Sequence, residues 1–355
     1  MLFGIDEDTG TQVVGWLMPD NPAAVSRVIA RMAEDNHAIV DATVFRPLLK
    51  EQGLHNTGVC GFVLDEANCP GLSTASDLRV LDADTNILLY RRRPLTGTVD
   101  KKFFRLETQL FRASSLDDVL QPRFHMTYPS LELAAEETIR CAIALFYTPS
   151  IYASGRVFWR VWEPLLRDRG FAAGALIRDP WHELAERLLI LKLASSPNGS
   201  AISAALGPMV ETTAQALRPV DIRDATALAA FLGALPDELR PVLFNPLTYQ
   251  LTAPNAFDPP PNPPVPAALE SLADMDAIGI RQDPGPFLDT VAALIELPEE
   301  LPELALPTSQ AVLSMVQALR GMPSAAALIS WDLAIFESVS ETLARVDGDV
   351  PSEAA

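Results

Sequence analysis

The chain is poor in cysteine and histidine, which argues against two kinds of small stabilising site. Its 355 residues include three cysteines, Cys60, Cys69 and Cys141, and four histidines. No C-x-x-C pair and no histidine pair at ligand spacing is present. We therefore expect neither a disulfide framework nor a structural metal. A Cys60–Cys69 bridge across a loop is the alternative to free buried thiols.

Cationic side chains are also scarce. Lysine and arginine together number 27 against 46 aspartates and glutamates, which gives a formal net charge of −19 at pH 7. Nucleic acids and anionic membranes bind proteins that present a concentrated cationic face. We therefore expect neither as a partner, and a phosphate or sulfate ligand would need a local cluster of arginines.

Long apolar runs are missing, although apolar residues make up 48% of the chain. No run reaches the length of a membrane span, so we expect no membrane insertion. The start of the chain is acidic and lacks the basic and then apolar layout of a secretory signal. These features predict a cytoplasmic protein.

Short β-rich runs dominate residues 11–93, after a segment, residues 1–10, that we expect to be a flexible N-terminus. The runs are separated by turn residues and lie at residues 11–18, 25–32, 37–45, 58–65 and 77–93. About six short strands at this spacing are typical of a β-sandwich.

The pattern changes in the rest of the chain, where helical periodicity prevails. Strand-like runs at residues 150–154 and 171–177 each precede a helical run, and the second helix has Pro180 at its first position. Strands and helices in alternation predict a parallel α/β sheet. We expect residues 94–347 to form an α/β domain with a largely helical C-terminal part, and residues 348–355 to be a flexible tail.

A set of residues in the β-rich part resembles a known module, whose usual marks are Gly-Trp in the first strand and Gly-Phe near the middle. The residues that carry the resemblance are Gly15, Trp16, Asp20, Arg46, Leu48, Leu49, Gly53, Gly61 and Phe62. They resemble a small β-sandwich module that accompanies bacterial glycosyltransferases and other surface-polysaccharide enzymes. The resemblance implies a role in surface-polysaccharide metabolism, with a glycan, a glycan precursor or another polysaccharide-synthesis protein as partner.

Four segments of the C-terminal part occur in the order in which a second family has them. They are the triplet Arg178-Asp179-Pro180 after a hydrophobic strand, and residues 245–251, 273–280 and 329–339. These segments resemble those of the sulfotransferases that act on carbohydrates. The resemblance implies a three-layer α/β fold of the P-loop-NTPase-like kind. It also implies transfer of a sulfuryl group from 3′-phosphoadenosine-5′-phosphosulfate to a glycan hydroxyl, without a metal.

The same resemblance implies a cofactor site in which Arg178 binds the 3′-phosphate, with Ser154 and Arg156 as helpers. A guanidinium suits phosphate because its rigid fork offers paired donors. However, Glu186 stands where the family has a serine, eight residues after the arginine. The 5′-phosphate loop is not recognisable, since its best positional candidate, residues 103–115, has neither glycine nor lysine. The catalytic base is unidentified.

Each of these features also has a purely structural interpretation. Arg178 can cap the strand and pair with a neighbouring carboxylate, and residues 154–156 can form a tight strand-to-helix turn. Trp159, Trp162 and Trp181 could stack on a sugar. However, residues 158, 162, 165 and 166 lie at the spacing of a buried helix face, which favours core packing.

Two main hypotheses about function follow, and they belong to different classes. The first is a sulfotransferase-like enzyme. The second is a catalytically inactive scaffold, with the β-sandwich binding a glycan or a partner enzyme. A glycosyltransferase-associated role is a third possibility, which rests on fold-level analogy alone. The surroundings of Arg178 discriminate between the first two. An open pocket with convergent donors would support catalysis, and an ion pair with Glu186 would support the scaffold.

Overall fold

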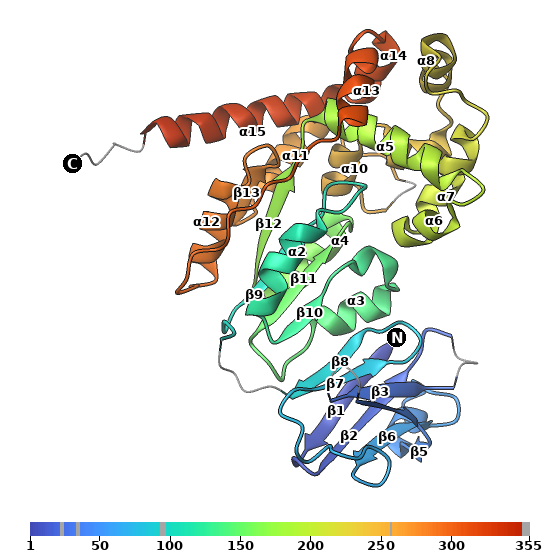
Figure 1. The fold of residues 1–355 in the computed structure, drawn as a ribbon, viewed down its shortest axis with the longest axis vertical. Coiled ribbons are helices and arrows are strands. Elements are labelled where there is room, and N and C mark those ends of the chain that lie inside the picture. Colours follow the sequence, from blue (N-terminus) through green and yellow to red (C-terminus); the bar gives the residue numbers. More distant parts are fainter. Residues whose placement is uncertain (22–24, 33–35, 93–96, 256–257, 350–355) are drawn as a thin grey trace. The chain divides into compact units, whose positions relative to one another are not determined.

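The computed structural model describes residues 1–21, 25–32, 36–92, 97–255 and 258–349 (Figure 1). The chain divides into two compact units. The first comprises Met1–Lys102, Leu120–Pro129 and Ala134–Ala153, and the second comprises Phe103–Val119, Ser130–Leu133 and Ser154–Ala355. The predicted domain boundary between residues 93 and 94 lies outside the described residues, as do residues 350–355 of the predicted tail.

Two four-stranded antiparallel sheets form the N-terminal part of the first unit, which confirms that this region is rich in antiparallel β-structure. One sheet has the order β1-β2-β6-β5 and the other β4-β3-β7-β8. The elements are β1 (Leu2–Asp8), β2 (Gln12–Met18), β3 (Arg27–Arg31), β4 (His37–Asp41), β5 (Val44–Phe45), α1 (Pro47–Glu51), β6 (Val59–Asp65), β7 (Leu78–Asp82) and β8 (Leu88–Arg92).

Residues 1–10 differ from the flexible terminus that the sequence predicts. Leu2–Asp8 form strand β1, which pairs with β2 and buries Phe3. The carboxylate of Asp8 accepts a hydrogen bond of 2.7 Å from Nε of Arg92, 84 residues away, and one of 2.8 Å from the hydroxyl of Tyr90. The acidic composition does not indicate a strand, because the side chains that bind the carboxylate of Asp8 lie 82 and 84 residues away.

Four residues of the N-terminal resemblance, Gly15, Arg46, Gly61 and Phe62, pack against one another. A Cβ atom at Gly15 would lie 2.6 Å from Cζ of Phe62 and 2.7 Å from the carbonyl oxygen of Gly4. Nη2 of Arg46 donates a hydrogen bond of 2.8 Å to the carbonyl oxygen of Gly15. A Cβ atom at Gly61 would lie 2.4 Å from Nε of Arg46. These residues therefore have a packing role in this fold.

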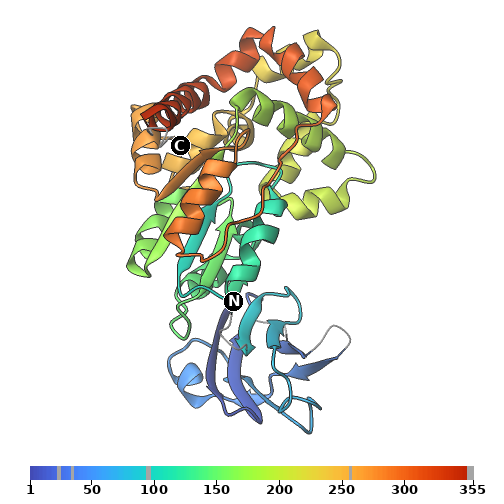
Figure 2. The same ribbon diagram turned by 60° about the vertical axis from the view of Figure 1, so that its left-hand side comes forward.

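A five-stranded sheet follows, with the order β10-β11-β9-β12-β13 (Figures 1 and 2). Its strands are β9 (Lys102–Leu106), β10 (Met126–Tyr128), β11 (Ile151–Gly155), β12 (Phe171–Ile177) and β13 (Ala277–Ile280). β10 pairs with β11, and β12 with β13, in parallel. Helices alternate with these strands, as predicted. β12 is apolar along its whole length, as is usual for a parallel strand covered on both faces.

Helices make up most of the second unit, and several lie beyond the carboxyl end of β12 in both views (Figures 1 and 2). A hydrophobic core of their own joins α5, α7, α8, α13 and α14. The helices of the chain after β9 are α2 (Ser114–Leu120), α3 (Glu136–Ile143), α4 (Trp159–Asp168), α5 (Pro180–Ala194), α6 (Ser200–Leu206), α7 (Pro208–Leu217), α8 (Ala225–Gly233), α9 (Arg240–Leu243), α10 (Pro246–Thr252), α11 (Pro264–Ala273), α12 (Gly285–Leu294), α13 (Gln310–Arg320), α14 (Pro323–Leu328) and α15 (Ser330–Asp349).

The packing at Gly15 generates a first prediction. Gly15→Ala should lower the unfolding free energy by about 1–3 kcal/mol, because the added methyl overlaps the Phe62 ring and the backbone of Gly4. The matched control is Gly233→Ala, where the new Cβ would lie 3.8 Å from Cβ of Ser324 and has room. Denaturant titration of both variants measures the difference. Equal stabilities would contradict this packing.

Candidate functional site

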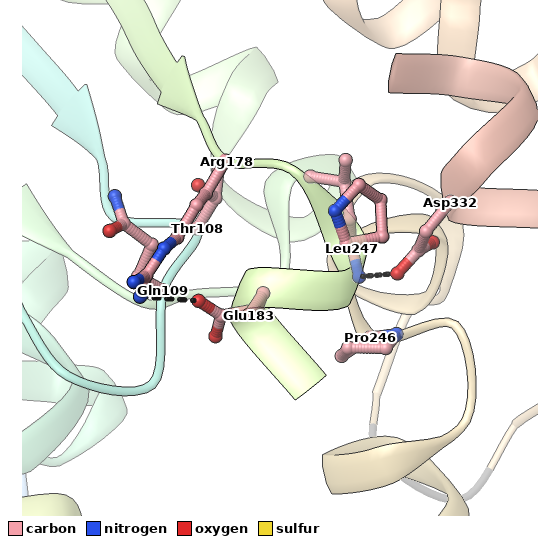
Figure 3. Close-up of a pocket in the computed structure, with 8 residues that line it drawn as sticks. Thr108, Gln109, Arg178, Glu183, Pro246, Leu247 and Asp332 are labelled. Carbon is pink, nitrogen blue, oxygen red and sulfur yellow. Dashed lines mark hydrogen bonds and ion pairs between the residues drawn. The ribbon is translucent and has the colours of Figure 1, made fainter. Parts of the chain in front are cut away.

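A small cavity lies at the carboxyl ends of β9 and β12 (Figure 3). Its volume is about 20 Å³. It is lined by Thr108, Gln109, Arg178, Pro180, Glu183, Pro246, Leu247 and Asp332. A space of this size holds about one water molecule. Three of the four segments that resemble the sulfotransferases therefore meet around it, although they are far apart in the sequence.

The position of this cavity in the sheet is that of a ligand site in many α/β proteins. β9 precedes the other four strands of its sheet in the chain but is the central strand, with β11 on one side and β12 on the other. Along the chain, the next strands, β10 and β11, lie on one side of β9, and the later strands, β12 and β13, lie on the other side. In open α/β sheets, ligands bind outside the carboxyl ends of the strands at such a switch point.

Arg178 is buried in an ion pair. It follows the last residue of β12 and is 4% exposed. Its Nη1 donates a hydrogen bond to Oε2 of Glu186 and lies 3.8 Å from Oε2 of Glu183, while its Nη2 has no hydrogen-bond partner among the described residues. Burial raises the pKa of Glu186, and the charge of Arg178 opposes this shift. The carboxylate of Glu186 thus binds the guanidinium of Arg178, which would otherwise be available to a phosphate.

The rest of the Arg-Asp-Pro corner starts helix α5. Oδ1 of Asp179 accepts hydrogen bonds from the backbone N–H groups of Trp181 at 2.8 Å and His182 at 3.1 Å. Pro180 occupies the first helical position, where its missing N–H costs nothing. The N-terminal donors that an anion would use are therefore already satisfied by Asp179.

Glu183 connects α5 to the segment after β9. Its Oε1 accepts a hydrogen bond of 2.8 Å from the backbone N–H of Leu110 and one of 2.6 Å from Nε of Arg187. Nη1 of Arg187 donates to the carbonyl oxygen of Val242 at 2.7 Å. Both charged side chains are at least nine-tenths buried, so this pair holds three segments together in the interior.

The loop after β9, the positional candidate for a 5′-phosphate loop, is folded around a carboxylate. Glu107 is 1% exposed. It accepts hydrogen bonds from Nη1 of Arg105 at 2.9 Å, from the backbone N–H of Gln109 at 3.1 Å and from that of Ala113 at 3.0 Å. One guanidinium and two backbone amides converge on Glu107, which is a donor set that suits an anion.

Ser154, predicted as a helper at the cofactor, belongs to the same buried network and does not line the cavity. Its hydroxyl donates a hydrogen bond of 2.8 Å to Oδ1 of Asp117 on α2. Asp117 also accepts one of 2.9 Å from Nη2 of Arg105 and lies 3.3 Å from Nε of Arg112. The hydroxyl of Ser154 thus serves a second internal carboxylate.

Arg156, the other predicted helper, binds carbonyl oxygens. Its Nη1 donates to Leu110 at 2.9 Å and its Nη2 to Leu206 at 2.7 Å. Its backbone N–H donates to Oε2 of Glu132 at 3.0 Å. Arg156 does not line the cavity either, and its contacts fix the strand-to-helix turn after β11 between the β9 loop and the end of α6.

Asn245 and Asp332, from two segments that resemble the sulfotransferases, cap each other's helices. Oδ1 of Asp332 accepts from the backbone N–H and hydroxyl of Thr248 at 2.9 and 2.6 Å, and Oδ2 accepts from the N–H of Leu247 at 3.0 Å. In return, Oδ1 of Asn245 accepts from the N–H groups of Trp331 at 2.8 Å and Asp332 at 3.2 Å. The reciprocal caps fix α10 against the start of α15.

The fourth segment, residues 273–280, lies beside β12 and does not line the cavity. Its residues Ala277–Ile280 form β13, and Oδ2 of Asp276 accepts a hydrogen bond of 2.8 Å from the backbone N–H of Ala173. Arg281 follows directly and donates to Oε1 of Gln109. The segment supplies sheet structure, and Arg281, the residue after it, is close enough to Arg178 for the two charges to interact.

The two tryptophans of α4 are core residues. Trp159 is 1% exposed, and its ring centre lies 6.4 Å from that of Phe104. Trp162 is also buried. Both side chains therefore pack in the core, as the helical spacing predicts.

Sequence reasoning misses Glu107 and Arg281 as parts of the site. Asp332 lies in the segment 329–339 that carries the resemblance, but the sequence predicts no role for it. For Glu107 the available signal is a carboxylate directly after a hydrophobic strand, because a charged residue there is buried only with partners. The resemblance predicts hydrogen-bond donors for a phosphate. Of the carboxylates that accept from these donors, it identifies Glu186 alone.

In comparisons with known proteins, no family model, no curated protein and no solved structure matches this chain. Among the described residues, no group of three or more histidine, cysteine, aspartate or glutamate side chains is placed to hold a metal ion. No helix in the same part of the chain is long and apolar enough to cross a membrane.

The burial of Asp332 generates a prediction about pH. Burial raises the pKa of Asp332 from 3.8 to about 6, against the hydrogen bonds from Thr248 and Leu247 that favour the carboxylate. The folded state therefore holds this proton more tightly than the unfolded state. Stability contributed by the protonated group is present below about pH 4 and is lost as the pH rises to about 6, by about 3 kcal/mol in total.

Asp332→Asn removes this titration. The unfolding free energy of the wild-type chain minus that of the variant should therefore fall as the pH rises through this window, when both are measured by denaturant titration. A difference that stays constant, or rises with pH, would contradict the burial of an ionisable carboxyl at this position.

Proposed function

We propose that the chain is a catalytically inactive, sulfotransferase-like scaffold of bacterial surface-polysaccharide metabolism, which binds a glycan or a partner protein. The observation that carries the proposal is that the chain's own carboxylates take the donors at both positions where the resemblance implies a phosphate. Glu186 pairs with Arg178 at the implied 3′-phosphate position, and Glu107 binds the donors of the loop after β9 at the implied 5′-phosphate position.

The finer fold is part of this proposal. Three features support a P-loop-NTPase-like sulfotransferase arrangement in three layers. The central strand of the sheet is β9, the cavity lies at the switch point of the sheet, and three of the segments that resemble the sulfotransferases line the cavity. The pair of antiparallel sheets in the first unit supports a β-sandwich.

The residues present do not fit 3′-phosphoadenosine-5′-phosphosulfate. A phosphate beside Arg178 would meet the carboxylate of Glu186, and one in the β9 loop would meet Glu107. Like charges in contact cost several kcal/mol unless one is neutralised or displaced. A cavity of about 20 Å³ is also far below the 300–1,000 Å³ of small-molecule sites.

The competing hypothesis is the sulfotransferase itself. The observation that favours it is Nη2 of Arg178, a buried donor without a hydrogen-bond partner among the described residues, at the carboxyl end of β12. In that account Glu186 moves away when the nucleotide binds.

Calorimetric titration with 3′-phosphoadenosine-5′-phosphate separates the two hypotheses. The scaffold predicts no binding heat at about 1 mM nucleotide, which corresponds to a binding free energy weaker than about −4 kcal/mol. Glu186→Ser, which supplies the family's serine, should also show no micromolar binding, because Glu107 still fills the other position.

Micromolar binding by the wild-type chain would overturn the proposal if Arg178→Ala abolishes it. The matched control is Arg320→Ala, which removes an exposed arginine of α13 in the same unit. Loss of binding in Arg178→Ala but not in Arg320→Ala would assign the phosphate site to the Arg-Asp-Pro corner.

A further inference from the structure

Strand β4 (His37–Asp41) stands at one end of its sheet. The sheet order is β4-β3-β7-β8, so β3 is its single neighbour among the described strands. Its side chains alternate between exposed and half-buried, and Ile39 is 59% exposed. An uncovered edge strand is a template for pairing with another strand, and proteins commonly protect such edges.

The register shows which backbone groups of β4 face outward. The N–H of Met32 donates to the carbonyl of Asn36 at 2.9 Å, and the N–H of Ala42 donates to the carbonyl of Ser26 at 2.8 Å. In an antiparallel ladder the hydrogen-bonded residues alternate. The even-numbered residues of β4 therefore bond to β3, and the N–H and C=O groups of its odd-numbered residues point away from β3.

The odd-numbered residues are His37, Ile39 and Asp41, and they form a self-complementary pattern. In antiparallel pairing of two such strands centred on Ile39, each His37 stands directly opposite Asp41 of the other strand, and the two isoleucines face each other. An imidazole offers an N–H donor to a carboxylate in either protonation state. Opposite-charge or donor–acceptor pairs at directly opposed positions stabilise a sheet, and like charges destabilise it.

We propose that β4 pairs antiparallel with β4 of a second copy of this chain, centred on Ile39. The pairing makes one continuous sheet from two four-stranded sheets and satisfies the outward backbone groups of His37 and Ile39 and the N–H of Asp41. The carbonyl oxygen of Asp41 already accepts a hydrogen bond of 3.1 Å from the N–H of Thr43 and would accept a second one. It also extends an apolar row, because Ile29 stands opposite Ile39 within each sheet. The pattern matches itself, which is why a second copy and not an unrelated strand is the partner.

The net charge of each copy opposes this association. Both copies carry −19, and their mutual repulsion is long-range. At about 0.15 M salt the screening length is about 8 Å, so contact pairs persist while most of the repulsion is removed. A five-residue edge is a small interface, so the dimer is expected to be weak and reversible.

Sedimentation equilibrium of the full chain at concentrations up to about 500 μM and about 0.15 M salt tests the proposal. The wild-type chain should associate to a dimer. Asp41→Lys places a lysine opposite His37 and should weaken the dimer by about tenfold or more, since two symmetry-related pairs are lost. The combined change His37→Asp and Asp41→Lys exchanges the two roles and should restore association.

Ile39→Pro is the backbone test, because it removes an N–H that points away from β3 and leaves the β3–β4 ladder intact. It should also abolish the dimer. If this variant fails to fold, the combined variant His37→Asp and Asp41→Lys still tests the pairing, since both of the residues that it changes are exposed. In the wild-type chain, hydrogen exchange at residues 37–41 should slow as the concentration rises.

Two results would overturn the proposal. One is a monomer at every concentration. The other is a dimer with the same association constant in the wild type, in Asp41→Lys and in the exchanged variant, which would mean that the copies meet elsewhere.

Discussion

The ion pair between Arg178 and Glu186 is the constraint on which the site depends. A guanidinium at the carboxyl end of β12 is almost completely removed from water, so it needs a negative partner in the same interior. Removing one partner of a buried pair typically costs about 3–5 kcal/mol, because the other charge is left without compensation. One hydrogen bond to a charged group returns only about 1.5–3 kcal/mol, which is less than this cost, so a single phosphate contact does not readily open the pair.

The same principle extends to the neighbouring loop. Arg105, Glu107 and Asp117 are each about 1% exposed and satisfy one another, with backbone amides and Ser154 as further donors. Buried donors of this kind are stabilised either by an anion bound from solution or by a carboxylate of the chain itself. This chain has the second arrangement at both positions, and the buried networks hold β9, β11, α2 and α5 in register.

Periodicity was sufficient to predict the β-rich N-terminal region and the alternation of strands and helices after it, but not the arrangement of the site. Alternation marked the antiparallel strands, and the apolar runs before Gly155 and Arg178 marked β11 and β12. Strand β1 was missed because its acidic residues have distant partners, since Asp8 pairs with Arg92 and Asp6 with Arg46. The triplet Arg178-Asp179-Pro180 was located correctly, since a strand end followed by Asp and Pro has a local signature.

The roles of Ser154 and Arg156 were beyond prediction for a physical reason. Their partners are Asp117, Leu110 and Leu206, which lie 37, 46 and 50 residues away in the chain. Local spacing specifies the turn that presents these side chains, but burial and long-range contacts decide what they bind. The hydrogen bonds that Glu107 accepts from Arg105, Gln109 and Ala113 could not be predicted either, because they depend on the path of the loop after β9.

A double-mutant cycle on Arg178 and Glu186 tests the central claim most directly. Unfolding free energies of Arg178→Ala, Glu186→Ala and the double variant give the coupling between the two side chains. The account predicts that each single change costs about 3 kcal/mol or more and that the double variant costs at least 1–2 kcal/mol less than the sum. Additive effects, or an Arg178→Ala variant as stable as the wild type, would contradict it and leave the guanidinium free for a phosphate.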